Sequence, residues 1–160
     1  MDKERKIEKL ERLIRHKREV LDNCILLAEN IVKEDGREFD FARRLVANAF
    51  VHDTTKLTTT IEWNHLTDSD EDGDDMLAVA IREHNESNMH HPESWDGIKN
   101  MPRVYVAEMV CDWKARSSEL GTDLCEWIDT KATKRWGFTK RDKVHKDIMW
   151  FVNLLIERNL

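Results

Sequence analysis

The sequence predicts an all-α protein, a single-domain helical bundle of about six to seven helices that spans residues 1–160. Only two prolines and five glycines interrupt the chain, so long helices can form. Hydrophobic residues make up 40% of the chain and charged residues 36%, a balance typical of a soluble, helix-rich protein. No segment shows the clear alternation of apolar and polar side chains that a half-buried strand requires.

Residues 3–33 carry the longest helical pattern. Asp35 and Gly36 supply a stop after it. His16 lies on the flank of the apolar stripe, on the same side as Val20, and can therefore face inward, although Lys17 interrupts the pattern. The apolar residues that recur at helical spacing are Ile7, Leu10, Leu13, Ile14, Val20, Leu21, Cys24, Leu27, Ala28 and Ile31.

Two shorter helices are expected next. One begins near Asp40 and ends at the adjacent pair His52-Asp53. The other covers residues 58–66, with threonines available as its N-caps.

An acidic segment follows over residues 68–75. Its first six residues match the opening of a calcium-binding EF-hand loop. The twelfth position of that loop needs a bidentate glutamate, whereas this chain has Val79. We therefore expect a solvated acidic loop that also caps the helix after it.

Four more helices complete the expected bundle. A fourth helix covers Met76–His84, and the proline and glycine of segment 90–97 mark a loop after it. A fifth helix, capped by Asn100, begins at Pro102 and reaches about Glu119.

The two remaining helices lie beyond residue 120. A short sixth helix opens at Gly121-Thr122. Thr139 and Asp142 form a capping pattern for a seventh helix, which extends to about Arg158.

The charge balance excludes one class of partner. The formal net charge is -6 and the isoelectric point is near 5.7, which argues against a protein that covers duplex nucleic acid. A small anionic substrate still fits, because one site needs only local positive charge. The three cysteines are far apart and form no CxxC pair, so neither a disulfide scaffold nor a thiolate zinc site is indicated.

The same composition predicts a cytoplasmic protein without a membrane partner. No apolar run approaches the roughly 20 residues that cross a bilayer. The charged stretch Met1–Lys6 lacks the apolar core of a signal peptide. A reducing compartment also suits unpaired cysteines.

Histidines and aspartates suggest a metal site. An imidazole and a carboxylate on consecutive residues, as in His52-Asp53, can hold one ion where a helix ends and the backbone turns. A single histidine at a helix boundary is more often a satisfied polar residue than a ligand. Here the candidates fall in four separate segments, as a site inside a helical bundle requires. They are His16, His52, Asp53, His84, His90, His91 and Asp112.

The order of these residues resembles the HD-domain superfamily of metal-dependent phosphohydrolases. The segment His52-Asp-Thr-Thr-Lys56 resembles its HD-x-x-K motif. The segment His90-His-Pro-Glu-Ser-Trp-Asp-Gly97 resembles the HHE-x-x-DG element of cyclic-dinucleotide phosphodiesterases. The resemblance spans about His16 to Asp112.

The resemblance implies an HD-like fold and a ligand set for one or two divalent ions per chain. His16, His52, Asp53 and Asp112 correspond to the ligands of the first ion. His84, His90 and His91 correspond to those of a second. Imidazole and carboxylate ligands suit manganese, iron, zinc, magnesium or cobalt.

Two departures from the phosphodiesterase pattern bear on the substrate. His84 lies only six residues before His90, and Pro92 displaces the glutamate that follows the histidine pair. The GYP continuation is also absent, because Ile98 follows Gly97. A cyclic dinucleotide is therefore not implied, and the number of ions stays open.

The implied reaction is hydrolysis of a nucleotide or similar small phosphoester by a metal-activated water. Positive side chains next to the ligands would assist, and Lys56, Lys114 and Arg116 are the candidates. Lys114 and Arg116 are equally well explained as solvated helix charges. Trp95 and Trp113 can stack on a base, but tryptophans in a small helical protein are more often core residues.

Two other functions fit the same residues. Some HD-like proteins hold two irons and use oxygen to oxidise a small molecule. A non-catalytic binding protein stabilised by its metal is the third interpretation. The sequence leaves the oligomeric state open.

Overall fold

A computed structural model of the protein describes residues 3–66 and 76–156, and every regular element within these ranges is a helix. The all-α prediction is therefore confirmed. The continuous run 124–136 counts as one helix, and the four-residue α3 (Thr55–Thr58) is left aside with the short 3-10 turns. Counted in this way, the described ranges contain seven helices, as expected.

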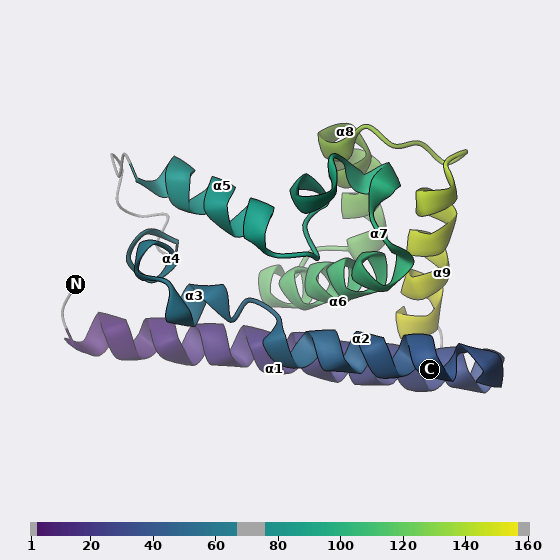
Figure 1. The fold of residues 1–160 in the computed structure, drawn as a ribbon, viewed down its shortest axis with the longest axis horizontal. Coiled ribbons are helices and arrows are strands. Elements are labelled where there is room, and N and C mark those ends of the chain that lie inside the picture. The colour runs from purple at the N-terminus through teal and green to yellow at the C-terminus, as the bar shows by residue number, and fades with distance from the viewer. Residues whose placement is uncertain (1–2, 67–75, 157–160) are drawn as a thin grey trace.

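Four helices form the body of the molecule. α1 (Lys3–Glu34) and α2 (Phe39–Val51) lie side by side, joined by the 3-10 turn η1 (Gly36–Glu38). α6 (Arg103–Leu120) packs against both, and α9 (Lys143–Ile156) packs against α1 and α6 (Figure 1). α6 is therefore the central helix.

The hydrophobic core lies between these helices. α1 contributes Val20, Cys24, Leu27 and Ile31, which are fully buried and spaced by about one helical turn. Fully burying one such aliphatic side chain contributes roughly 1.5–3 kcal/mol. α6 has ten buried residues among its 18, because neighbours cover it on several sides. Polar side chains of α6 can therefore point into the interior of the protein.

A second layer carries the chain from α2 back to α6. α4 (Thr60–His65) packs against α5 (Leu77–Ser87), and α5 packs against the 3-10 turn η2 (Pro92–Trp95). Only Ala80 and His84 of α5 are buried. The single buried polar residue of this helix thus faces the rest of the protein.

α7 (Leu124–Trp127), the π-helix η4 (Ile128–Ala132) and α8 (Thr133–Trp136) form one continuous helical run. A cluster of tryptophans packs this run against α6. The Trp113 and Trp136 rings stack with centroids 5.3 Å apart, and Trp127 meets Trp113 at 5.0 Å. Trp113 is therefore a core residue.

The expected third helix differs from the observed one. Residues 55–65 form two short helices, α3 and α4, separated by Thr59. The expectation that threonines cap the helix was wrong. Thr59 precedes α4 but makes no capping bond, because its hydroxyl donates to the carbonyl of Thr55 at 3.0 Å.

Two further cap assignments were wrong. Asn100 does not cap α6, because it ends the turn η3 (Ile98–Asn100) and its amide donates to the Asp96 carbonyl at 3.0 Å. Gly121 does not open the sixth helix but ends α6, with φ of 64° in the left-handed region that favours glycine. Asp123 caps α7 instead, and its carboxylate accepts from the Glu126 amide at 2.7 Å.

The other boundaries agree with expectation. α5 begins one residue after Met76 and runs three residues beyond His84. Before α9, the Asp142 carboxylate accepts from the Thr139 amide at 2.7 Å, the contact that the capping pattern predicted. The expected end of this helix near Arg158 lies outside the described residues. The predicted acidic loop, residues 68–75, lies outside the described residues. None of the described helices is long and apolar enough to cross a membrane.

Candidate metal centre

The structure brings all seven predicted ligand residues into one cluster, in which five are buried and His91 and Asp112 are half-buried. α1 supplies His16, the end of α2 supplies His52-Asp53, α5 supplies His84, the following loop supplies His90-His91, and α6 supplies Asp112. Ligand atoms of Asp53, His84, His90 and His91 all lie within 4.8 Å of one another, and so do those of His16, His52 and Asp112.

An unusual turn lets consecutive residues share this cluster. α2 ends at Val51, His52 is extended with ψ of 129°, and Asp53 takes the left-handed conformation with φ of 53°. Within a helix, adjacent side chains point about 100° apart, whereas at this turn His52 Nε2 and Asp53 Oδ2 lie 3.7 Å from each other. Aspartate tolerates the left-handed region better than most residues.

Lys17 holds the turn in place. Its ammonium group donates to the His52 carbonyl and, at 3.2 Å, to the Thr54 hydroxyl. Burial lowers the pKa of Lys17, although the carboxylate of Asp53 opposes that change. The lysine that interrupted the apolar stripe of α1 thus supports the site.

Asp53 lies at the middle of the cluster. Its Oδ1 is 3.3 Å from His84 Nε2 and 3.4 Å from His90 Nε2. Its Oδ2 is 3.7 Å from His52 Nε2 and 4.0 Å from His16 Nε2. One carboxylate therefore faces two sets of imidazoles with its two oxygens.

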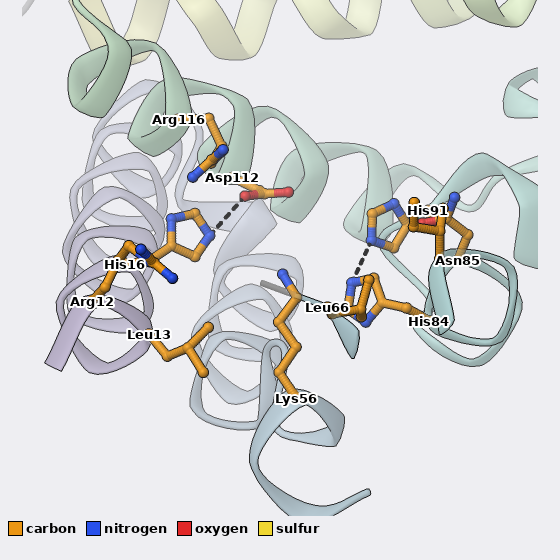
Figure 2. Close-up of a pocket in the computed structure, with 11 residues that line it drawn as sticks. Arg12, Leu13, His16, Lys56, Leu66, His84, Asn85, His91, Asp112 and Arg116 are labelled. Carbon is orange, nitrogen blue, oxygen red and sulfur yellow. Dashed lines mark hydrogen bonds and ion pairs between the residues drawn. The ribbon is translucent and has the colours of Figure 1, made fainter. Parts of the chain in front are cut away.

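Asp112 completes one of the two sets. Its Oδ1 is 3.0 Å from His16 Nε2, the pair joined by a dashed line in Figure 2, and 3.9 Å from His52 Nε2. On the other side of Lys56 in the same view, His84 Nε2 and His91 Nε2 face each other at 3.0 Å.

Three buried atoms in this cluster lack a hydrogen-bond partner among the described residues. They are His52 Nε2, Asp53 Oδ1 and His90 Nε2. An unsatisfied buried polar group costs roughly 1–3 kcal/mol, and three such groups in one place need an explanation. All three are potential metal-ligand atoms, so the cluster fits one or two divalent ions.

Three glutamates outside the predicted set contact the Nδ1 atoms of four of these histidines. Glu119 Oε1 is 2.7 Å from His16 Nδ1, and Glu62 Oε2 is 2.8 Å from His84 Nδ1. Glu108 Oε1 is 3.0 Å from His52 Nδ1 and 3.5 Å from His90 Nδ1. In histidines that bind metals, the N–H of the second ring nitrogen usually donates a hydrogen bond to such a carboxylate, and this bond orients the ring.

Signals for two of these glutamates were present in the sequence. Glu108 interrupts an apolar run of the fifth predicted helix, one turn before Asp112. Glu119 lies two turns after Asp112 and so on the same helix face. Glu62 carries no comparable signal, because its partner His84 belongs to another helix.

The charged groups of the cluster shift one another's pKa values. Burial by itself lowers the pKa of His16 and His52, but the surrounding carboxylates, Asp112 and Asp53 among them, raise both values above the ordinary one. Burial would raise the pKa of Asp53, yet His52 and Lys56 hold it well below its usual range. Without an ion, this half of the cluster favours protonated imidazole beside ionised carboxylate.

His91 differs from these histidines. Burial and the neighbouring imidazoles of His90 and His84 lower the pKa of His91 to about 2. His91 is therefore neutral, which is the form that binds a metal ion.

A cavity of about 330 Å³ opens beside the cluster. Cationic side chains lie around it, and Figure 2 shows Lys56 between the two pairs of ligand residues. Lys56 Nζ is 2.5 Å from Asp53 Oδ2, and although burial would lower the pKa of Lys56, Asp53 raises it, so the amine is charged. The lining residues are Arg12, Leu13, His16, Lys56, Leu66, Ile81, His84, Asn85, His91, Asp112 and Arg116.

Of the three cations predicted to assist the reaction, two reach this cavity. Lys56 and Arg116 line it, whereas Lys114 is not among its described lining residues. Lys114 Nζ donates to the Ser118 hydroxyl at 3.0 Å. The reason is helical phase, because Arg116 lies one turn after Asp112 and Lys114 lies about 200° around the helix from it.

Comparison with known proteins adds one finding. No curated protein and no solved structure matches the chain. Residues 5–158 match the family described as Family of unknown function (DUF5662). Because this match covers nearly the whole chain, the protein belongs to the DUF5662 family.

Proposed function

We propose that the protein is a metal-dependent phosphohydrolase that acts on a nucleotide or similar small phosphoester. The observation that carries this proposal is the position of Asp53. Its two oxygens face two sets of imidazoles, and its Oδ2 also contacts the Lys56 ammonium at the cavity. Asp53 would therefore help to hold one or two divalent ions beside a cationic substrate site.

Two ligand sets follow from the distances. His16, His52, Asp53 and Asp112 would hold one ion. Asp53 would hold the other ion together with the three remaining histidines, His84, His90 and His91. Sets rich in imidazole suit manganese, iron, cobalt or zinc better than magnesium, which prefers oxygen ligands.

The bound ions would acidify water for attack on phosphorus and offset negative charge on the phosphoryl oxygens. The protein's own side chains would position the substrate. Lys56, Arg116 and Arg12 place positive charge around the cavity. Arginine in particular binds phosphoryl oxygens with paired hydrogen bonds.

The same cations help to separate this proposal from the alternatives. A di-iron oxygenase would use similar ligands, and a non-catalytic binding protein would use the same cavity. The three cations around the cavity suit the negative charge of a phosphoryl group. We therefore favour hydrolysis of a phosphorylated small molecule.

The compartment that we propose is the cytoplasm. Cys24 and Cys111 are buried with free thiols, and Cys125 is also unpaired. Free cysteines persist in a reducing compartment.

Metal analysis followed by an activity screen tests the function. Mass spectrometry of manganese-loaded protein should find up to two ions per chain in wild type and none in Asp53→Ala. Lys114→Ala is the matched control, since this half-buried lysine lies on α6 and does not line the cavity, and it should keep the wild-type metal content. The loaded wild type should then hydrolyse p-nitrophenyl phosphate or a nucleotide.

Two results would contradict the proposal. Wild type that binds no metal under any loading condition would remove its basis. A stoichiometric iron pair that consumes oxygen, without hydrolysis of any phosphoester, would assign the site to oxidation instead.

A further inference from the structure

A second hollow, of about 570 Å³, adjoins the metal cavity. Arg12 and Arg116 line both spaces, so the two lie next to each other along the faces of α1 and α6. The residues that line the second hollow are Arg12, Arg15, Glu19, Arg116, Ser118, Glu119 and Leu120. We call it the arginine hollow.

Arginines dominate the charge of this hollow. Arg12, Arg15 and Arg116 are exposed, so their guanidinium groups are accessible to a ligand. Two carboxylates oppose them. Glu119 already bonds His16 through Oε1 at 2.7 Å and Arg116 through Oε2 at 2.6 Å. Neither of these two bonds of Glu119 involves Arg15, which lines the hollow with the carboxylate of Glu19.

The arginines differ in which of the two spaces they line, and this difference assigns them to different parts of a substrate. Arg12 and Arg116 lie at the boundary, where they can contact groups in either space. Arg15 lines only the arginine hollow, one helical turn along α1 from Arg12. A phosphoryl group held near Lys56 would therefore leave Arg15 available for a different part of the same molecule.

Apolar surface accompanies the positive charge. Leu120, which is 65% exposed, lines the arginine hollow, and Leu13 lines the metal cavity. Each space therefore offers at least one apolar side chain that can contact the organic part of a ligand. A bare inorganic anion would have no use for them.

We propose that the substrate is a small molecule with two phosphate groups, one bound at the metal cavity and the other in the arginine hollow. This inference rests on the proposed function, because the first phosphate is assigned to the metal site. Arg15 is the residue that would distinguish a bisphosphate from a monophosphate.

Binding measurements test the inference without requiring turnover. Manganese-loaded protein is titrated with adenosine 3′,5′-bisphosphate and with adenosine 5′-monophosphate in a calorimeter. A charged hydrogen bond strengthens binding by roughly tenfold or more, so wild type should bind the bisphosphate at least about tenfold more tightly. Arg15→Met should lose most of this preference.

Arg18→Met provides the control. Arg18 is exposed on the same helix but lines neither space, so this variant should keep the preference. Equal affinities of wild type for the two nucleotides would overturn the inference. A preference that survives both Arg15→Met and Arg12→Met/Arg15→Met would also overturn it.

The outcomes separate this inference from the proposed function. Hydrolysis of p-nitrophenyl phosphate without any preference for the bisphosphate would reject the arginine hollow and keep the hydrolase. A preference that depends on Arg15, with no hydrolysis of any phosphoester, would support the two-anion site and reject the hydrolase.

Discussion

Glu108 and His52, which are 56 residues apart in the chain, meet in the interior of the protein, where Glu108 Oε1 lies 3.0 Å from His52 Nδ1. Both side chains are almost fully buried. The same oxygen of Glu108 is 3.5 Å from His90 Nδ1. One carboxylate thus orients one imidazole from each proposed ligand set.

This relationship predicts the effect of Glu108→Gln. The amide keeps the shape of the side chain but removes the charge that favours the ligand orientation and basicity of His52 and His90. Loss of such a partner commonly lowers metal affinity by roughly 10- to 100-fold. Competition with a fluorescent chelator measures this change, and Glu126→Gln, on the exposed face of α7, should leave affinity unaltered.

Metal stoichiometry should follow the two ligand sets. His16→Ala removes a ligand from one set and His91→Ala from the other, so each variant should retain about one ion under conditions where wild type holds two. Asp53→Ala should retain none, because that carboxylate faces both sets. Mass spectrometry of the desalted proteins gives the counts. Two ions retained by both histidine variants would show that the division into sets is incorrect.

Stabilisation by metal should increase with pH. The pKa values of His16 and His52 are raised in the metal-free fold, so their protonated forms stabilise it fully below the ordinary value of 6.5. That contribution is lost as pH rises through the raised values. A metal ion needs neutral imidazole, so protons compete with it at low pH. Melting curves at pH 5.5 and 8 should show a larger manganese-induced rise in Tm at pH 8.

Because Tm of the manganese-loaded protein is compared with Tm of the metal-free protein at the same pH, the contributions of titrating groups that the ion does not contact cancel. Asp53 and Asp112 do not reverse the trend. Their pKa values are lowered, so both stay ionised throughout this window. A manganese-induced rise in Tm that is equal at both pH values would contradict this account.

Lys17→Met should loosen the His52-Asp53 turn. The substitution keeps much of the aliphatic stem but removes the ammonium that donates to the His52 carbonyl and the Thr54 hydroxyl. Leaving a buried carbonyl without a donor costs roughly 1–3 kcal/mol. Denaturant unfolding of metal-free protein measures this loss of stability. Lys6→Met, at an exposed position of the same helix, should change stability little.

Helical phase explains which parts of the site could be predicted. The apolar spacing of residues 3–33 predicted α1, and a one-turn interval separates Asp112 from Arg116, which reaches the cavity. Lys114 lies about 200° around the helix from Asp112, so helical phase alone also argues against a role for Lys114 at the cavity. Such relationships lie within one helix, so local sequence is sufficient to find them.

Caps were harder to predict because they depend on a few competing hydrogen bonds. Asn100 has a side chain that suits a helix cap, yet it bonds Asp96 within the preceding turn. Thr59 is positioned before α4, yet it bonds Thr55. In a cap the side-chain oxygen accepts from a backbone amide, whereas each of these side chains donates to a backbone carbonyl instead. The sequence shows which side chains could cap a helix but not which local hydrogen bond the fold selects.

By itself, the sequence determined that the chain is helical and which residue types could bind a metal ion. Tertiary structure alone decided that His16, Asp53, His84 and Asp112 meet, and that Glu62, Glu108 and Glu119 orient the histidines. The physical reason is range. Helix formation depends on neighbours within about one turn, whereas the centre depends on contacts between four helices whose packing no local pattern specifies. The His52-Asp53 pair depends on both local sequence and tertiary structure, because its position at a helix end is set locally and its partners are distant in the chain.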